Sequence, residues 1–191
     1  REALSLCTGR VLDLGAGAGR HALELQNTGH PVVALDLLEN AVQIMLDRGV
    51  VDARCGHLDT LAGERFDTIL MLMHGLGVVG DLHGLGLLLE DLPKFLKPGG
   101  RFVCDSADLA AVLDDEAPDV LHELAAPDRY LGEVEFRLRF NGIDGAPYRW
   151  LFVDPETLGL IADAAGFDCR IADSGARGSF TAVLTLQESE S

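Results

Sequence analysis

Basic residues are scarce in this sequence, and lysine is nearly absent. The 191 residues include 31 Asp and Glu against 15 Lys and Arg, so the formal net charge is −16, and only Lys94 and Lys97 are lysines. Such a charge repels nucleic-acid phosphates and anionic lipid headgroups, which disfavours nucleic acid as a partner. Strong acidity with so little lysine also suggests residence in a salt-rich cytoplasm.

Long hydrophobic runs and closely spaced cysteines are missing as well. Asp, Glu or Gly interrupts every apolar stretch before it reaches the length of a membrane span, so we expect no membrane association. The four cysteines lie far apart and form no C-x-x-C pair, which disfavours a metal site or a disulfide framework. Buried thiols in a reducing cytoplasm are the favoured interpretation. The chain begins at Arg1 with no signal-peptide pattern, which suggests a trimmed start or a domain boundary.

Apolar runs alternate with amphipathic stretches in the first half of the chain, and 48% of all residues are apolar, enough for one packed domain. This alternation predicts a doubly wound, Rossmann-like α/β sheet with mostly parallel strands. Pro93 should kink the last helix of this half, and "LKPGG" (Leu96–Gly100) should form a tight turn. The second helix should turn Ala41, Ile44 and Met45 inward. The expected strands are Val11–Leu14, Pro31–Leu35, Val51–Cys55, Phe66–Met73 and Arg101–Cys104, and the expected helices are Arg20–Thr28, Asn40–Arg48 and Leu82–Leu96.

The pattern changes after the fifth strand. Leu109–Leu124 is acidic and mostly helical, with a break expected at Pro118. "EVEFRLRF" (Glu133–Phe140) alternates strictly and predicts a half-exposed antiparallel strand, which the turn "NGIDG" returns to Tyr148–Val153 as an inserted hairpin. Asp154 and Pro155 should open a helix, before strands at Asp168–Ala172 and Phe180–Leu186, the last antiparallel. We expect one domain with a cofactor-binding half (1–106), an acceptor-side half (107–186) and a disordered tail (187–191).

The stretch "VLDLGAGAGR" combines an apolar strand with a glycine turn and the start of a helix. Gly15, Gly17 and Gly19 let the backbone approach a nucleotide-like cofactor, and the helix start points N–H groups at it. Asp36 ends the second strand about 20 residues past the first glycine, where an acid accepts ribose hydroxyls in both NAD and S-adenosylmethionine sites; a solvated strand-end Asp is the alternative. Arg20 stands where the dinucleotide fingerprint G-x-G-x-x-G needs its third glycine, which argues against NAD.

Further along, "RFDTILMLM" and "LKPGGRFVCDS" follow in order. With "LDLGAGAGRHALEL" and "GHPVVALD" before them, the chain from Arg10 to Ser106 resembles the class I S-adenosylmethionine-dependent methyltransferases. The resemblance implies that Asp13 and the glycine turn hold the methionyl end of the cofactor. It also implies that Asp36 holds the ribose and that Leu37 packs against adenine. The residues assigned to the turn are Gly15, Ala16, Gly17, Gly19 and Arg20.

The adenine contact departs from the family pattern. Many members carry a Gly-Asp pair after the third strand, whereas this chain has Gly56-His57 and an acid only at Asp59. The His57 ring, the Leu58 N–H or the Asp59 carboxylate could serve instead, or His57 could be an ordinary polar loop residue. We assign His57, Leu58 and Asp59 to the cofactor site, with these alternatives open.

The acceptor side begins at "MHGLGVVGD" (Met73–Asp81), after the fourth strand. This segment lacks the acid or amide followed by Pro-Pro-aromatic that methyltransferases acting on adenine or glutamine nitrogens carry. Met73 is assigned to the cofactor site, and His74 is a candidate base, a pocket residue or a structural residue. Asp105 and Ser106 face the same edge of the sheet, Asp105 as a second candidate catalytic residue, or else they cap a helix.

The hairpin offers two further features. Tyr148 and Trp150 either form an acceptor wall or belong to the core. Three arginines, Arg137, Arg139 and Arg149, either form a cationic patch or pair with the glutamates of the same hairpin.

The sequence therefore predicts an enzyme that transfers a methyl group from S-adenosylmethionine to a small-molecule acceptor and releases S-adenosylhomocysteine. In-line displacement requires that the acceptor be held near the methyl group in a dry pocket, and it needs no metal ion. Two alternatives remain, an NAD-binding oxidoreductase on the same fold and a non-catalytic protein that keeps the cofactor pocket as a scaffold.

Overall fold

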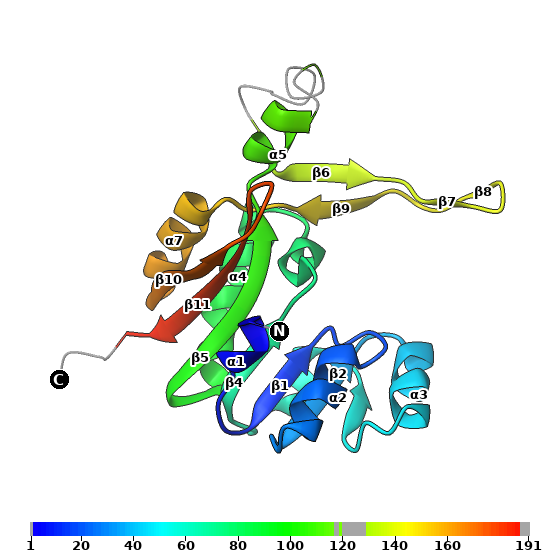
Figure 1. Ribbon diagram of the computed structural model, residues 1–191, viewed down its shortest axis with the longest axis vertical. Coiled ribbons are helices and arrows are strands. Elements are labelled where there is room, and N and C mark those ends of the chain that lie inside the picture. The colour runs from blue at the N-terminus through cyan, green and yellow to red at the C-terminus, as the bar shows by residue number, and fades with distance from the viewer. Residues whose placement is uncertain (1, 117–118, 120–128, 188–191) are drawn as a thin grey trace.

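A computed structural model describes residues 2–116, 119 and 129–187 of the chain (Figure 1). Its main element is a seven-stranded sheet in the order β10-β11-β5-β4-β1-β2-β3. The first five strands of the chain pair in parallel, and β11 runs antiparallel to both β5 and β10. This confirms the predicted doubly wound sheet with an antiparallel last strand. The strands are β1 (Val11–Leu14), β2 (Val32–Asp36), β3 (Ala53–Cys55), β4 (Phe66–Met71), β5 (Leu96–Ala107), β10 (Phe167–Ser174) and β11 (Ser179–Leu186).

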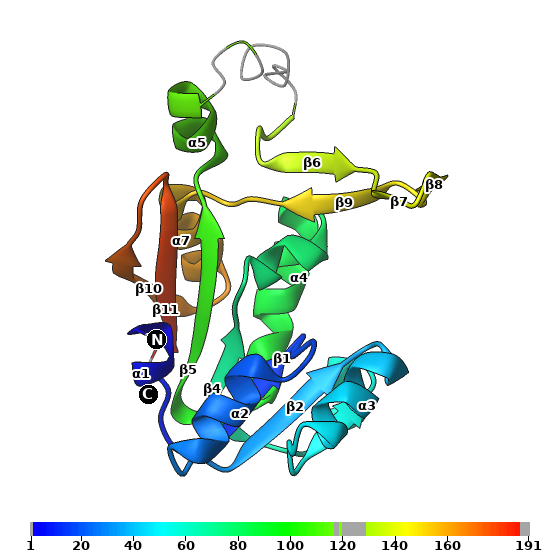
Figure 2. The ribbon, with the colours of Figure 1, turned by 45° about the vertical axis from the view of Figure 1, so that its right-hand side comes forward.

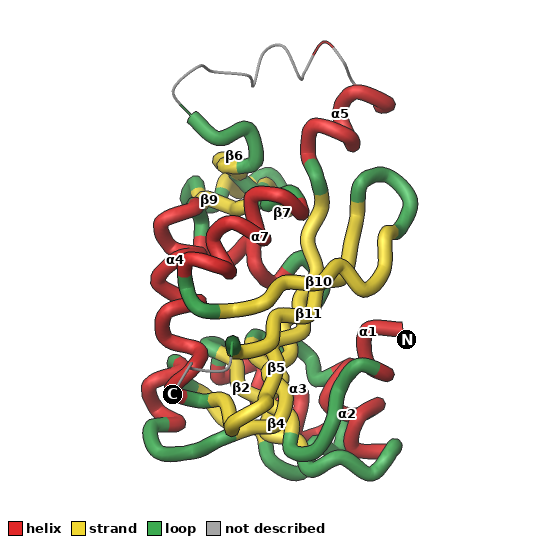
Figure 3. The backbone as a smooth tube through the Cα atoms, turned by 90° about the vertical axis from the view of Figure 1, so that its left-hand side faces the viewer, coloured by secondary structure: helices red, strands yellow, loops and turns green. Residues whose placement is uncertain are grey.

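Helices cover both faces of the sheet (Figure 3). On one face, α4 and α7 bury Leu85, Leu89, Leu158 and Ala162 in the larger core cluster. On the other, α2 and α3 bury a second cluster that also contains Cys7, next to α1. The helices are α1 (Glu2–Ser5), α2 (Arg20–Asn27), α3 (Glu39–Asp47), α4 (Leu82–Asp91), α5 (Leu109–Glu116) and α7 (Pro155–Ala164), and the 3-10 turns are η1 (Leu58–Leu61), η2 (Gly75–Val79) and η3 (Leu92–Lys94).

Two predictions for the first half of the chain need correction. The buried residues of α3 are Val42 and Met45, whereas Ile44, which the periodicity placed inward, is 48% exposed. This helix lies by the β2–β3 edge of the sheet, so only a narrow stripe of it reaches the core. "LKPGG" is not a free turn but the irregular start of β5, where the register with β4 shifts between Phe66 and Thr68. Pro93 acts as predicted, because α4 ends at Asp91 and a 3-10 turn follows.

The predicted hairpin is present and projects from the body (Figures 1 and 2). Asn141 and Gly142, both with positive φ, form its tip. Leu138 and Phe140 are 65% and 77% exposed, although the alternation predicted a half-buried strand. The hairpin reaches beyond the body, so only its base can bury an apolar face. Its strands are β6 (Glu133–Phe136), paired with β9 (Tyr148–Leu151), and β7 (Arg139–Phe140), paired with β8 (Ile143–Asp144).

Two of the hairpin arginines pair with aspartates and not with the glutamates of the same hairpin. Arg139 forms an ion pair with Asp144, and Arg149 reaches Asp81 at the start of α4. Glu133 instead accepts a hydrogen bond from the Leu82 N–H at 3.0 Å. The base of the hairpin is therefore tied to α4.

Several further predictions concern the last helix, the chain ends and the cysteines. Asp154 caps α7 by accepting the Thr157 N–H at 2.9 Å, as predicted. The expected break at Pro118 and residues 188–191 of the expected tail lie outside the described residues. Contrary to the expectation of buried thiols, Cys169 is only partly buried, and Cys55 is exposed because it ends an edge strand. Within the described ranges, no helix combines the length and the apolar character needed to cross a bilayer.

Candidate cofactor and acceptor site

The glycine turn between β1 and α2 lies at the carboxyl edge of the sheet. All three glycines have left-handed backbones, with φ of +74° at Gly15, +55° at Gly17 and +74° at Gly19. A Cβ atom at Gly15 or Gly17 would meet no atom within 4 Å, whereas one at Gly19 would lie 2.9 Å from side-chain atoms of Met45 and Val50. The first two glycines therefore border open space that a ligand can enter, and the third permits close packing against α3.

Asp36 joins the second strand to this turn. Its Oδ2 accepts the Gly17 N–H at 2.8 Å, and its Oδ1 accepts the Leu38 N–H at 3.0 Å. Leu37 and Leu38 beside it are 54% and 67% exposed. A carboxylate next to an exposed apolar surface is an arrangement that suits a ribose with its attached base.

Asp13 is the most buried charged residue of this edge. The side chain is 2% exposed, and its Oδ2 has no hydrogen-bond partner in the described part of the chain. Burial raises the pKa of Asp13 from 3.8 to about 7; the Ala22 N–H that it accepts opposes this shift, and the charge of Asp36 adds to it. A ligand with a positive group would compensate the buried carboxylate.

The first turn of α2 adds two side chains to this edge. Arg20 is exposed, and His21 is half-buried. Burial and the neighbouring Arg20 lower the pKa of His21, and the carboxylate of Asp105 opposes that shift. Sequence reasoning did not single out His21, although its position directly after the glycine turn was a usable signal. It also missed Arg48, which donates to the Ala18 carbonyl and so braces the turn from α3.

The segment after β3 lies beside Asp36. The Gly56 N–H donates to the Asp36 carbonyl at 3.0 Å, which brings the following residues to the same edge. His57 and Asp59 have exposed side chains, while Leu58 packs partly against the core. The residues expected near adenine thus follow directly on the strand that pairs with the one carrying Asp36.

The end of β4 meets the end of β5 at Asp105. Its Oδ2 accepts the Met73 N–H at 3.0 Å, and its Oδ1 accepts the His74 N–H at 2.7 Å. The imidazole of His74 lies edge-on to Phe152 with ring centroids 5.9 Å apart. Both candidate catalytic residues therefore lie together, but the carboxylate of Asp105 is occupied by backbone amides.

Ser106 has a structural role. It is buried, and its Oγ accepts the Val153 N–H at 3.0 Å, which ties β5 to the segment after β9. The residue that caps helix α5 is Asp108, which accepts the Ala110 N–H at 2.9 Å. Neither Asp105 nor Ser106 caps a helix, because β5 continues to Ala107.

The hairpin aromatics connect the acceptor side to the body. Trp150 packs over Gly77 of η2 so closely that a Cβ atom at Gly77 would overlap the indole. From there, Tyr148, Phe136 and Phe152 follow in successive ring contacts with centroids 5.9 to 6.3 Å apart. With His74 they form a continuous row of rings from β4 to the hairpin, which favours an acceptor wall for Tyr148 over a core position.

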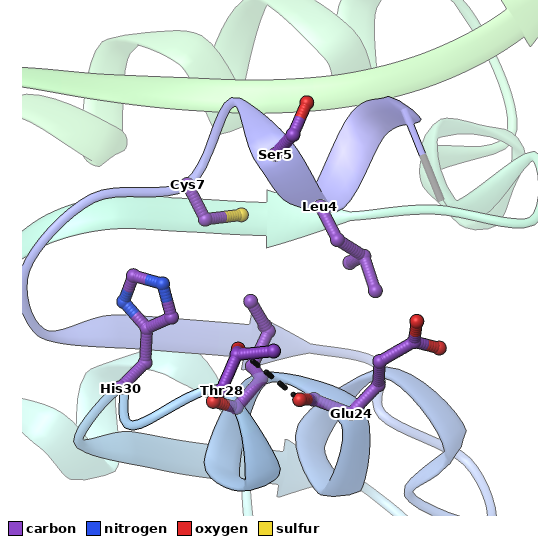
Figure 4. A pocket seen from close by; sticks show the side chains of 7 residues that line it. Leu4, Ser5, Cys7, Glu24, Thr28 and His30 are labelled. Carbon is purple, nitrogen blue, oxygen red and sulfur yellow. Dashed lines mark hydrogen bonds between the residues drawn. The ribbon is translucent and has the colours of Figure 1, made fainter.

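Two cavities lie elsewhere. One of about 390 Å³ is bordered by α1 and the second half of α2, with Cys7 and His30 on its wall (Figure 4). Burial raises the pKa of the Cys7 thiol to about 12, which leaves it unreactive near neutral pH. The other, of about 330 Å³, lies near Arg10 and Pro31 at the amino ends of β1 and β2. Ligands of doubly wound sheets bind at the carboxyl ends, so neither cavity is the cofactor site.

The chain is similar in sequence and structure to known methyltransferases. A family model described as a methyltransferase domain matches residues 4–170. A solved S-adenosylmethionine-dependent methyltransferase from Bacteroides fragilis, in complex with S-adenosyl-L-homocysteine, is 36% identical. The similarity covers 97% of this chain and 76% of that protein, with a TM-score of 0.81. No curated protein sequence matches the chain.

Two more distant structures share the fold. The CcbJ methyltransferase from Streptomyces caelestis is 19% identical, with 98% of this chain and 89% of that one covered and a TM-score of 0.73. CalS10, an amino pentose methyltransferase from Micromonospora echinaspora, is 18% identical, with 97% and 86% covered and a TM-score of 0.62.

Proposed function

Because the chain belongs to the class I S-adenosylmethionine-dependent methyltransferases, we propose that the carboxyl edge of its sheet transfers the methyl group to a small molecule. Methyl transfer with S-adenosylmethionine as cofactor follows from the family, and this replaces the NAD-dependent and non-catalytic alternatives. The strongly acidic surface supports a small acceptor over nucleic acid. The relative CalS10, whose name describes a methyltransferase of an amino pentose, supports the same class of acceptor.

The observation that carries the proposal is the bond between Asp36 and the glycine turn, next to open space at Gly15 and Gly17. Asp36 would hold the ribose hydroxyls, and Leu37 would pack against adenine with His57, Leu58 or Asp59 at its edge. The residues also fit S-adenosylmethionine at its methionyl end. The Asp13 oxygen that has no partner among the described residues would be compensated by the α-ammonium. Ala16, Gly19 and Arg20 would complete the turn around that part, and Met73 would border it from β4.

Bound at this edge, S-adenosylmethionine supplies an electrophilic methyl group on a positively charged sulfur. The chain then has to align the acceptor and exclude water. His74 would face the acceptor and take its proton when the attacking atom carries one. Asp105 is less suited to that role, because both of its oxygens accept backbone N–H groups. Residues 1–106 would hold the cofactor and 107–186 the acceptor within one domain, and the free cysteines agree with a cytoplasmic setting.

Calorimetry tests the cofactor site. We expect S-adenosylhomocysteine to bind the wild-type protein and NAD not to bind. Asp36→Ala should weaken S-adenosylhomocysteine binding about tenfold or more, because the ribose loses a charged hydrogen-bond acceptor. Asp47→Ala is the matched control, since Asp47 is exposed at the end of α3 and its carboxylate accepts a hydrogen bond from the Gln43 side chain on the same helix. Unchanged affinity in Asp36→Ala with the fold intact by circular dichroism would contradict the ribose assignment.

A methyl-transfer assay tests the acceptor class. Release of S-adenosylhomocysteine should appear with at least one member of a panel of small amines, alcohols and phenols. Turnover confined to protein or nucleic-acid acceptors would contradict the small-molecule assignment. His74→Gln should lower kcat for acceptors that must lose a proton and leave the affinity for S-adenosylhomocysteine unchanged.

A further inference from the structure

Two consecutive residues after β4 have left-handed backbones although neither is glycine. The φ angle is +65° at Met73 and +56° at His74. The other two such residues in the described ranges, Asn141 and Arg177, lie in exposed turns between paired strands. A non-glycine residue keeps this conformation only where its surroundings hold it there, and such positions cluster at functional sites. The end of β4 therefore needs an interaction that holds it.

The carboxylate of Asp105 provides that interaction. Its two oxygens accept the N–H groups of Met73 and His74 at 3.0 and 2.7 Å. Asp105 follows Cys104 on β5, and Cys104 pairs with Met71 on β4, so the parallel register of the two strands places the carboxylate beside the turn. Hydrogen bonds to an ionised carboxylate are among the strongest in proteins. One side chain thus holds both left-handed residues at once.

In the described ranges, the imidazole of His74 makes no hydrogen bond that would orient it. Its Nδ1 is buried and has no hydrogen-bond partner within the described ranges, and its ring contact is the edge-on approach to Phe152. The direction of the ring therefore depends on the backbone that carries it. We propose that Asp105 is a positioning residue that holds the left-handed Met73–His74 turn and thereby aims the His74 imidazole at the acceptor side.

A second effect of Asp105 must be separated from this one. The charge of Asp105 raises the pKa of His21 against burial and the neighbouring Arg20. Asp105→Asn removes the charge and one of the two acceptor oxygens while keeping the size of the side chain. A variant could therefore act through lost charge alone, and the experiment must distinguish lost charge from lost backbone geometry.

NMR of the cofactor-free protein makes that distinction. In Asp105→Asn we expect loss of the nuclear Overhauser contact between the His74 and Phe152 rings and a further fall in the pKa of His21. Adding Met73→Gly should restore the ring contact, because glycine adopts a positive φ without strain. The pKa of His21 should stay low in the double variant, since the charge is still missing. If the His74–Phe152 contact returns while the pKa of His21 stays low, the lost contact was caused by the backbone and not by the lost charge, which identifies the positioning role.

Asp108→Asn is the matched control. The carboxylate of Asp108 also accepts two successive amides, from Ala110 at 2.9 Å and Ala111 at 3.3 Å, but these begin helix α5. This variant should leave the His74–Phe152 contact intact. The proposal is overturned if Asp105→Asn keeps the contact, if Met73→Gly does not restore it, or if Asp108→Asn also removes it. Should Asp105→Asn fail to fold, recovery of folding by Met73→Gly supports the proposal, and continued failure overturns it.

The consequence for catalysis rests on the proposed function, and it is measured by a kinetic assay that is independent of the NMR experiment. With an acceptor from the panel that must lose a proton, Asp105→Asn should lower kcat on the order of tenfold, because a misdirected His74 takes that proton poorly. In calorimetry, its affinity for S-adenosylhomocysteine should fall by a smaller factor than kcat, because Asp105 acts on the cofactor only through Met73. Unchanged kcat would refute the catalytic consequence alone, and a panel without turnover would count against the proposed function alone, while the NMR result is independent of both.

Discussion

At the scale of single residues, Asp13 shows how a side chain proposed to bind the cofactor can lower stability. Its carboxyl group is buried at the end of β1, and one of its oxygens has no partner in the described ranges. A buried carboxylate without a counter-charge is unfavourable in the free protein, and a cationic ligand would remove that penalty. We therefore expect the folded protein to be less stable without the cofactor, and cofactor binding to remove this penalty.

Comparing the wild type with Asp13→Asn should show this penalty as a difference in stability that depends on pH. Asp13 has a pKa of about 7 in the folded protein against 3.8 ordinarily, so between these pH values the folded state holds a proton that the unfolded state has released. The stability of the wild type relative to Asp13→Asn should therefore fall as the pH rises from about 4 to about 7, by at most about 4 kcal/mol. Urea denaturation of both proteins across this range measures the difference.

Asp47→Asn, at an exposed position, should show no such trend. A gap between wild type and Asp13→Asn that stays constant with pH would contradict the burial of an uncompensated carboxyl group. Asp13→Asn should also weaken S-adenosylhomocysteine binding, because the neutral amide lacks the charge that attracts the α-ammonium.

At the scale of elements, the hairpin is divided into an anchored base and a free tip. Trp150 packs on Gly77, and Glu133 bonds to the start of α4, whereas the apolar tip residues Leu138, Phe140 and Ile143 are 65 to 77% exposed. The base borders the acceptor side, and the tip stands apart from the seven-stranded sheet. The two parts should therefore contribute differently to folding and binding.

Replacing residues 137–147 by Asn-Gly tests this division. The new turn would connect Phe136 directly to Tyr148, which already pair across the hairpin, and Asn-Gly suits a two-residue connection. We expect the thermal midpoint and the affinity for S-adenosylhomocysteine to stay close to those of the wild type. Loss of cofactor binding in calorimetry would show that the tip supports the body after all.

At the scale of the whole molecule, the net charge of −16 is the dominant feature. Like charges on a compact surface repel one another. Dissolved salt weakens this repulsion, and at 0.1 M exposed charges more than about 10 Å apart are largely screened. We expect the thermal midpoint to rise as KCl increases from about 0.01 M to about 1 M. Sucrose is the control, because it favours compact states without screening charge. An unchanged midpoint in KCl would contradict both the repulsion and the suggested salt-rich setting.

Local patterns were enough to predict most of the elements and the meeting of Asp36 with the glycine turn. The strand Val11–Leu14 has the predicted bounds, and the glycine turn and Asp36 do meet, because each depends on residues close in sequence or on standard strand order. Predictions that required the phase of a helix or the reach of a hairpin were less successful. Ile44 is exposed and Phe140 extends into solvent, since periodicity does not indicate where the rest of the molecule ends.

The sequence by itself determined the fold class, because alternating apolar patterns specify strands and helices locally, and its motifs together carried the family resemblance that implies S-adenosylmethionine as the cofactor. Only the tertiary structure decided what the polar residues at the carboxyl edge of the sheet do. Asp105 bonds to amides 31 and 32 residues away, and Ser106 holds an amide 47 residues away. Contacts of that kind depend on which distant segments pack together, and no local spacing records them.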